Sequence, residues 1–374
     1  MAISIIRQPT SIKGAFSSML YQASDTANVG NDSFYFEYKV YVWSGTNTIP
    51  ATPIATIQRL PDVFADNRSF IDISKIVTQY INDEWFTLGA ANPNIGAGAV
   101  YSAVKIQGFW YVGATLTSDA QVSSNVILAT KGYEYTLQGF NQATSKRVLT
   151  DRSIVYLTEE SKYDYLWYDA TKITSITIGA TTITPTAVTS SSTYIQSIEL
   201  RAKLTTASLW GTNCNIVFNY SGGSETIQVV FNCVSKYGCN TLFYKNKYGV
   251  IESLSMNALS KISVTTTNEN YYKGIYAQSN MAQAWDYAVK IKSLYNVQGI
   301  YKQLANTNWI DESYVEIIQQ IMLSTVCYTV YDSVIYSCQI IDTALEKKTY
   351  RNDKLIMYTL NFEFAQPLIN SIVR

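Results

Sequence analysis

The stretch from 240 to 256 constrains the fold most, because it has the pattern of a β-hairpin in the middle of the chain. Residues 242–244, Leu-Phe-Tyr, are typical of a strand that is apolar on both faces. A polar turn follows over 245–249, in which Gly249 can take the positive φ that a tight reversal requires. From Val250 onward the side chains again alternate between two faces. We therefore predict a hairpin over 240–256.

Regular alternation predicts strands elsewhere in the chain. In the segment 34–43, one face collects Phe34, Phe36, Tyr38, Val40 and Val42. In the segment 354–364, one face collects Ile356, Tyr358, Leu360, Phe362 and Phe364. Shorter or weaker patterns predict strands at 54–60, 100–112, 131–137, 154–157, 163–168, 173–178, 194–200, 215–220, 226–230, 262–266, 285–294, 327–331 and 334–341.

Two segments have helical spacing of their apolar residues instead. The first covers 72–81, where Asp72 can cap the start and the apolar stripe is Ile73, Ile76, Val77, Tyr80 and Ile81. The second covers 311–323, where Asp311 can cap the start and the stripe is Tyr314, Ile317, Ile318 and Ile321. We expect both helices to be short and to pack on β-sheets.

A chain of 374 residues with 47% hydrophobic residues is long enough for two or three cores. Strand patterns at regular spacing, with turn residues between them, favour sandwiches. We predict a mainly β protein with a few short helices, built from tandem β-sandwich domains of the immunoglobulin or fibronectin kind. The expected domains are 1–147 with the helix near 72–81, 148–258 ending in the hairpin 240–256, and a C-terminal α+β domain, 259–374, with the helix near 311–323.

Composition argues against common kinds of chemistry. Charged residues make up 15% of the chain, and 28 basic residues balance 28 acidic ones, so no net field attracts nucleic acid or an anionic membrane. The chain has no histidine, which removes Ser-His and Cys-His nucleophile pairs and His-ligated zinc. Its 30 tyrosines fit a protein with broad interfaces, and they equally fit a β-rich protein.

The cysteines do not form a metal-binding pattern. No C-x-x-C pair occurs among Cys214, Cys233, Cys239, Cys327 and Cys338. Cys233 and Cys239 could lie near one another across a turn, but free buried thiols are the favoured interpretation. The N-terminal segment lacks the basic and apolar parts of a signal peptide, and no window reaches about 18 apolar residues, so we expect no membrane span.

Carboxylate pairs are the remaining route to catalysis. Candidates are Glu159 and Glu160 with Asp164, or Glu312 with Glu316, although the last two suit the start of a solvated helix. Lys245 and Lys247 beside Tyr244 and Tyr248 resemble a small basic-aromatic patch for nucleic acid, but solvated turn residues are more common. A sugar-stacking platform could use Trp43, Trp110 and Trp167, for which a core or interface role is favoured. We predict no enzymatic activity, no cofactor and no metal.

Several motifs occur in order across nearly the whole chain. They are Gln8-Pro9 with Gly14-Ala15, the helix start Asp72-Ile73-Ser74, the turn Asn246-Lys247-Tyr248-Gly249, and a closing segment from Glu346 to Glu363. Together they resemble virion structural proteins of Bacteroidetes-infecting, crAss-like phages, whose hairpin carries Asn-Arg-Phe/Tyr-Gly. The chain departs from that pattern after Gly249, where it has Val-Ile-Glu-Ser and the family usually has Trp-Asp.

The resemblance implies a non-enzymatic tail ring or hub subunit around the DNA ejection channel, linking the portal or neck to the distal tail. The implied partners are copies of itself in a six- or twelve-fold ring, neighbouring ring, portal or fibre proteins, and genomic DNA by passive contact. The protein would be made in the host bacterial cytoplasm and end in the virion tail. The interface residues that we expect are Gln8 and Pro9 in an N-terminal arm, and Lys245, Asn246, Lys247, Tyr248 and Gly249.

Two other classes stay open. A receptor- or glycan-binding tail fibre or adhesin is the main alternative, although such fibres usually trimerise through repetitive stalks and this chain has no repeat. A carboxylate glycosidase is the third, and it requires two acids whose replacement abolishes sugar cleavage.

Overall fold

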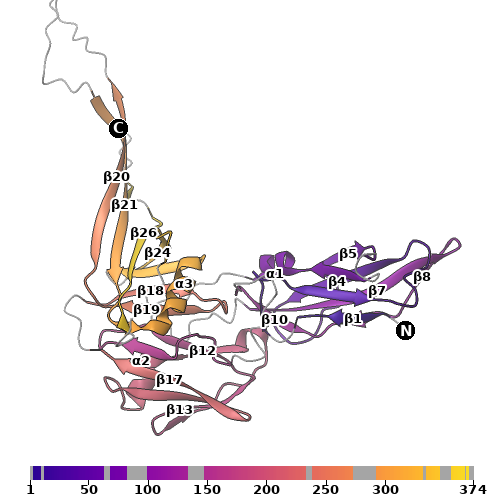
Figure 1. The fold of residues 1–374 in the computed structure, drawn as a ribbon, viewed down its shortest axis with the longest axis horizontal. Helices are drawn as coiled ribbons and strands as arrows, with labels where there is room; N and C mark the ends of the chain where they lie inside the picture. The colour runs from indigo at the N-terminus through magenta and orange to yellow at the C-terminus, as the bar shows by residue number, and fades with distance from the viewer. Residues whose placement is uncertain are drawn as a thin grey trace, which may run out of the picture.

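The computed structural model describes residues 3–9, 12–62, 68–81, 99–133, 147–232, 238–272, 292–331, 334–345, 355–366 and 368–369. It is mainly β with a few short helices, as the sequence predicted, in several antiparallel and mixed sheets. Strands make up 53% and helices 10%, and the described residues contain three helices. Figure 1 shows an elongated N-terminal unit on one side, two further units stacked on the other, and a long β-ribbon projecting from the last. The immunoglobulin or fibronectin type of the sheets stays a prediction.

The N-terminal unit contains two sheets. The larger has the order β2 (Ile12–Gly14), β10 (Ile127–Thr130), β7 (Val100–Val112), β4 (Tyr35–Trp43) and β5 (Ala55–Arg59), with β8 (Thr115–Ser118) and β9 (Val122–Ser123) also paired to β7. The smaller has the order β1 (Ser4–Arg7), β3 (Leu20–Ser24) and β6 (Ser69–Asp72). The predicted inward face of β4 is confirmed, since Phe36, Tyr38, Val40 and Val42 are all buried.

The middle unit contains a five-stranded and a two-stranded sheet. The first has the order β11 (Ile154–Leu157), β17 (Gly223–Phe231), β16 (Cys214–Tyr220), β13 (Ile173–Ile178) and β14 (Thr181–Ile183). The second pairs β12 (Tyr165–Asp169) with β15 (Ile195–Glu199), and the 3-10 turn η3 (Ser191–Thr193) leads into β15. Helix α2 (Leu200–Thr206) follows β15 directly.

The C-terminal unit is an eight-stranded sheet with a helix on it. Its order is β19 (Ile251–Met256), β18 (Asn240–Lys245), β23 (Cys327–Tyr331), β24 (Val334–Ile340), β26 (Thr359–Phe364), β21 (Lys292–Asn306) and β20 (Lys261–Tyr272), with β27 (Leu368–Ile369) also on β21. The short strands β22 (Ile310–Asp311) and β25 (Leu355–Ile356) pair separately. The 3-10 turn η4 (Glu312–Tyr314) leads into α3 (Val315–Leu323), which packs against β18.

The hairpin is confirmed, with β18 and β19 paired from Asn240↔Met256 to Lys245↔Ile251. Its place in the fold differs from the expectation that it closes the second unit. Tyr244 of β18 pairs with Cys327 of β23, so the hairpin forms one edge of the C-terminal sheet. A partner strand more than 80 positions away in the chain leaves no local signal, and the sequence could not identify it.

Both predicted helices exist, and they begin slightly later than expected. Helix α1 covers Ser74–Tyr80, and the Asp72 carboxylate accepts the Ser74 N–H at 2.9 Å, but Tyr80 is exposed and leaves the buried stripe. At α3, the side chain of Asp311 accepts the Ser313 N–H at 2.9 Å as predicted for a cap. The α3 stripe of Tyr314, Ile317, Ile318 and Ile321 is buried throughout.

Three strand predictions need correction or lie outside the described residues. Residues 194–200 end in α2, because Leu200 and Leu204 both reach the core of the middle unit at helical spacing. Residues 131–133 are not a strand, while 134–137 lie outside the described residues. Of the segment 285–294, only 292–294 are described, and they belong to β21.

The buried apolar residues form one cluster for each unit, a fourth between the units, and a small fifth of Phe243 and Ile251 on the hairpin. The three unit cores lie within 3–129, 148–229 and 242–364. The fourth joins Leu128 of the N-terminal unit, Trp167 of the middle unit and Tyr248 of the hairpin turn. The hairpin turn therefore lies in this shared core, where the units meet.

Candidate functional site

The predicted interface turn closes through the side chain of Asn246. The Asn246 N–H donates to the Val250 carbonyl at 2.9 Å, and the Gly249 N–H donates to the Asn246 carbonyl at 2.9 Å. The Asn246 Oδ1 accepts the N–H groups of Tyr248 and Val250 at 3.0 and 3.2 Å. Gly249 has a φ of 83°, which confirms the role expected for this glycine.

The backbone of the turn lies directly against the N-terminal unit, and of the side chains there Thr130 bonds to it. The Tyr133 N–H donates to the Lys247 carbonyl at 2.8 Å, and the Thr130 hydroxyl donates to the Tyr248 carbonyl at 2.9 Å. Between these bonds Gly249 faces Gly132, which in turn faces Gly14. A Cβ atom on Gly132 would lie 2.5 Å from the Lys247 carbonyl oxygen, so only glycine permits this approach.

The turn also contacts the middle unit and α3. The Asn246 amide nitrogen donates to the Leu149 carbonyl at 2.8 Å. Asp151 accepts three donors, namely the Lys247 ammonium at 2.6 Å, the Tyr248 hydroxyl at 2.7 Å and the Gln320 amide at 2.7 Å. The Gln320 side-chain oxygen accepts the Lys247 N–H at 3.1 Å. We call residues 246–249 with Gly14, Gly132, Asp151 and Gln320 the hairpin junction.

A second polar cluster lies further along the hairpin and is completely buried. Arg152 lies 3.7 Å from Glu252, and it donates to the Ser253 carbonyl at 3.0 Å and the Tyr165 carbonyl at 3.3 Å. The Tyr244 hydroxyl donates to the other Glu252 oxygen at 2.6 Å. Because Arg152 and Glu252 are 5% and 1% exposed, neither is accessible to a substrate-sized molecule. The cluster therefore joins β19 to the middle unit.

The pKa values of Asp164, Tyr244 and Arg152 in this cluster are all raised, but for different reasons. Burial raises the pKa of Asp164, although the Ser253 hydroxyl at 2.7 Å and the Arg152 charge both act to lower it. Burial also raises the pKa of Tyr244 well above its ordinary range, and the neighbouring Glu252 raises it further. Burial alone would lower the pKa of Arg152, but Glu252 and the other nearby acidic groups raise it overall. All these directions fit groups that are isolated from solvent.

The structure places most of the expected interface turn inside the chain. Lys245, Asn246 and Tyr248 are buried, whereas Lys247 and Gly249 are half-buried. The interpretation of Lys245 and Lys247 as plain solvated turn residues is therefore wrong, and its cause is the long-range contact with Gly132 and α3. That these residues contact another chain stays a prediction, for which Lys247 and Gly249 retain the most surface.

The expected N-terminal arm packs on its own unit within the described residues. Ser4–Arg7 form β1 on β3, and Ile12–Gly14 form β2 on β10. Between them Pro9 is buried, and the side-chain oxygen of Gln8 accepts the Asn125 N–H at 2.9 Å. A contact of Gln8 or Pro9 with a partner chain stays a prediction.

The carboxylate candidates do not come together as a pair of catalytic groups. Glu159 and Glu160 are exposed at an open depression that Lys162 and Arg201 also line, whereas Asp164 is buried against Ser253. Glu312 and Glu316 lie in the first turns of η4 and α3. Glu312 and Glu316 thus stand where a helix start favours acidic side chains, and Asp164 serves a buried hydrogen bond.

The tryptophan candidates do not form a platform either. Trp110 belongs to the N-terminal core and Trp167 to the shared core, where its indole donates to the Ile251 carbonyl at 2.6 Å. Trp43 is half-buried and contacts the ring of Tyr101. The core role favoured for Trp110 and Trp167 is confirmed.

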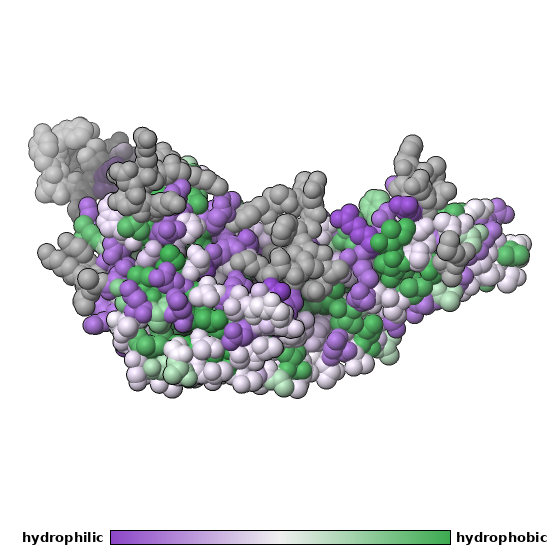
Figure 2. Space-filling model, turned by 60° about the horizontal axis from the view of Figure 1, so that its bottom comes forward, coloured by the Kyte–Doolittle hydropathy of each residue, from purple (hydrophilic) through white to green (hydrophobic). Residues whose placement is uncertain are grey.

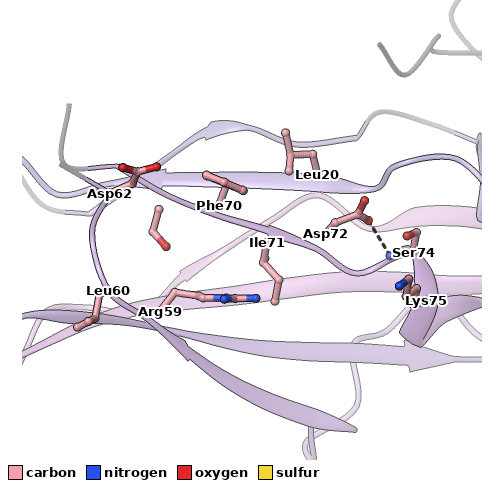
Figure 3. Close-up of a pocket in the computed structure, with 10 residues that line it drawn as sticks. Leu20, Arg59, Leu60, Asp62, Phe70, Ile71, Asp72, Ser74 and Lys75 are labelled. Atoms are coloured by element: carbon pink, nitrogen blue, oxygen red, sulfur yellow. Dashed lines mark hydrogen bonds between the residues drawn. The ribbon is translucent and has the colours of Figure 1, made fainter. Parts of the chain in front are cut away.

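A second depression, of about 600 Å³, lies on the N-terminal unit between β5, β6 and the start of α1 (Figure 3). Its lining mixes Arg59 and Lys75 with Asp62 and Asp72, and it includes the exposed Leu60 and Phe70. Figure 3 shows Asp72 bonded to Ser74 at the helix start. Because charges of both signs line this depression, its charge does not select a class of ligand.

Four described cysteines, Cys214, Cys239, Cys327 and Cys338, are free thiols, and Cys233 lies outside the described residues. Cys327 and Cys338 face one another on β23 and β24, and burial raises the pKa of the Cys327 thiol to about 11. Among the described residues, no group of three or more His, Cys, Asp or Glu could hold a metal ion. No helix in the described part of the chain is long and apolar enough to cross a membrane.

No protein-family model and no curated protein matches the chain.

Proposed function

We propose that this protein is a non-enzymatic structural subunit of a phage virion, in a tail ring or hub around the DNA channel. The observation that carries the proposal is the hairpin junction. Residues 246–249 carry the main motif of the resemblance to crAss-like phage virion proteins, and their contacts hold three units of one chain together. A motif used in this way supports an architectural role.

The surface supports the same proposal. Figure 2 shows hydrophilic and hydrophobic residues interspersed over one face, as expected for a chain with few charges. The buried Arg152–Glu252 cluster is enclosed and the exposed acids Glu159 and Glu160 lie beside basic side chains. The buried cluster thus serves packing between units, and this supports an assembly protein over an enzyme.

The proposal is tested by the mass of the purified protein in solution, with electron micrographs of the same sample. We expect cyclic particles of many copies, of which six- or twelve-fold rings fit a tail best. A stable trimer would instead favour the alternative of a glycan-binding fibre, and glycan-array binding would then separate the two. A protein that stays monomeric at every concentration and shows no rings would contradict the ring proposal.

A further inference from the structure

The ribbon formed by β20 and β21 projects far beyond the rest of the C-terminal sheet (Figure 1). Its strands pair over twelve positions, from Lys261↔Leu304 to Tyr272↔Lys292. Every residue of β20 is exposed, so the described part of the chain covers neither face of this strand. A two-stranded ribbon is at best marginally stable in water on its own, so this one is expected to gain a partner.

The outer edge of β20 is open to further strand pairing. β20 stands at the end of its sheet, and no described strand pairs with its other side. From Ile262 to Asn268 it contains neither a charged residue nor a proline, which are the usual guards of an exposed edge. The irregularity at Glu269/Asn270 adds its extra residue to β21, so β20 itself remains a regular template.

The opposite edge of the same sheet is closed within the chain. β19 is almost entirely buried, and its outward carbonyl groups accept donors from the middle unit. The Trp167 indole donates to the Ile251 carbonyl at 2.6 Å, and Arg152 donates to the Ser253 carbonyl at 3.0 Å. Of the two edges of this sheet, the β20 edge is therefore the one at which a partner strand can pair.

The ribbon offers two complementary edges. On the far side of β21, pairs between described strands begin at Gln298 with β27 and continue from Lys302 with β26. Over 292–297 that side of β21 has no strand partner among the described residues. On the opposite edge of the ribbon, the outer side of β20 has none either. In a head-to-tail arrangement, identical ribbons pair the β20 edge of one copy with the β21 edge of the next. Repetition of this contact closes a ring in which no strand edge is left unpaired. An unrelated strand would pair with only one of the two edges.

Exposed apolar side chains on one face of the ribbon also indicate that this face is buried in an assembly. Ile262, Val264 and Tyr272 lie on one face of β20, and Leu294 lies on the same face as the partner of Asn270. All four are exposed, to 40%, 50%, 74% and 56% respectively. The other face carries Lys261, Ser263, Thr265, Thr267 and Glu269, and Tyr271 lies at its far end, 43% exposed. From Lys261 to Thr265 the alternation is typical of a sheet with one buried and one solvated face.

We propose that the outer edge of β20 pairs with the outer edge of β21 in a neighbouring copy of this chain, so that the ribbons form a closed sheet in the assembly. This inference rests on the proposed function, because it takes the cyclic assembly as its setting. It adds the contact surface and the identity of the partner, which is a second copy.

The test is disulfide cross-linking between two differently tagged full-length chains that are expressed together. One chain carries Asn268→Cys and the other Leu294→Cys or, in a second pair, Val297→Cys. We expect disulfide-linked heterodimers after mild oxidation in at least one mixture and none with either variant alone. Thr115→Cys on β8, another exposed strand, serves as the control, and the unmodified chain measures the background from native cysteines.

The outcomes separate the two proposals. Cross-linking of Asn268→Cys with itself alone would show symmetric pairing of β20 and would overturn the head-to-tail arrangement. Rings without cross-links in either mixture would overturn the inference and leave the proposed function standing. An unmodified chain that never assembles would overturn both.

A pair of lysine substitutions gives an independent measurement. Thr266→Lys with Asn268→Lys places guard charges on the open edge, and we expect loss of the assembled species with an unchanged melting temperature of the chain. Thr115→Lys with Thr117→Lys on β8 is the matched control and is expected to assemble normally. Normal rings from the β20 variant would contradict the inference.

Discussion

Gly132 and Gly249 lie so close that a Cβ atom on Gly249 would be 2.6 Å from the Gly132 nitrogen. One belongs to the N-terminal unit and the other to a turn more than 100 residues later. The contact is made by backbone alone, with a hydrogen bond from the Tyr133 N–H to the Lys247 carbonyl at its side. The junction between units therefore depends on glycine at both positions.

Gly132→Ala is expected to destabilise the junction. A methyl group there meets backbone atoms that cannot rotate away, and overpacking of this kind costs about 1–3 kcal/mol. The measurement is the urea midpoint and melting temperature of the full chain. Gly30→Ala is the control, since nothing lies within 4 Å of its Cβ position. Equal stability of the two variants would show that the units do not meet as described.

Removing one charge of the buried Arg152–Glu252 pair should lower the free energy of unfolding more than removing both charges. Arg152→Met leaves the Glu252 carboxylate buried without its cation, which costs about 3–5 kcal/mol. Adding Glu252→Gln keeps an acceptor for the Tyr244 hydroxyl and should restore much of the loss. A double-mutant cycle by urea denaturation measures the coupling. Purely additive effects would contradict the pairing of these two residues.

Asp164 and Asp72 should affect stability with opposite dependence on pH. Burial raises the pKa of Asp164 above its ordinary 3.8, so its favourable contribution is complete below about pH 3.8 and is lost as the pH rises through the folded value. Asp164→Asn should therefore stabilise the protein at neutral pH, and the gain should vanish in acid. Melting temperatures between about pH 3 and pH 8 measure this.

Asp72 provides the contrast within the same experiment. Burial alone would raise its pKa, but hydrogen bonds from Ser74, Ser18 and Met19 lower it overall. Its contribution is present above the ordinary value of 3.8 and is lost as the pH falls through the folded value. Asp72→Asn should destabilise the protein at neutral pH. The same sign for both variants would be inconsistent with the two environments.

Asn246→Asp tests why the turn uses an amide. The aspartate can still accept the Tyr248 and Val250 N–H groups, but it cannot donate to the Leu149 carbonyl. It places a charge at a site that is completely buried, and we expect a loss of at least about 2 kcal/mol. Asn125→Asp at an exposed position is the control. Similar urea midpoints for both variants would argue against the buried turn.

Local patterns in the sequence were sufficient to predict much of the fold. Alternation identified β4 and the strand with Leu360, Phe362 and Phe364, because each strand has one face on a core. Helical spacing and a cap identified α3 and its four buried residues. The hairpin followed from the apolar run at 242–244 and from Gly249.

Contacts between distant segments could not be predicted in this way. The turn looked like a solvated tip, and its burial depends on Gly132, Leu149 and Gln320, which are remote in sequence. The apolar residues Ile262 and Val264 looked like those of any half-buried strand, although both are exposed on the ribbon. Asn246 did give a signal for the turn, since an amide in a turn often bonds to neighbouring backbone. Its partner across the junction, the Leu149 carbonyl, could not be identified from the sequence.

Hydrogen–deuterium exchange, measured below and above the concentration at which the protein assembles, tests the central claim most directly. The claim is that the hairpin turn joins units within one chain while the β20–β21 ribbon joins copies. We predict that the amides of 246–250 are protected at both concentrations, and that those amides of 262–268 that point away from β21 gain protection only in the assembly. Protection that appears at the turn on assembly, with none gained by β20, would contradict this account.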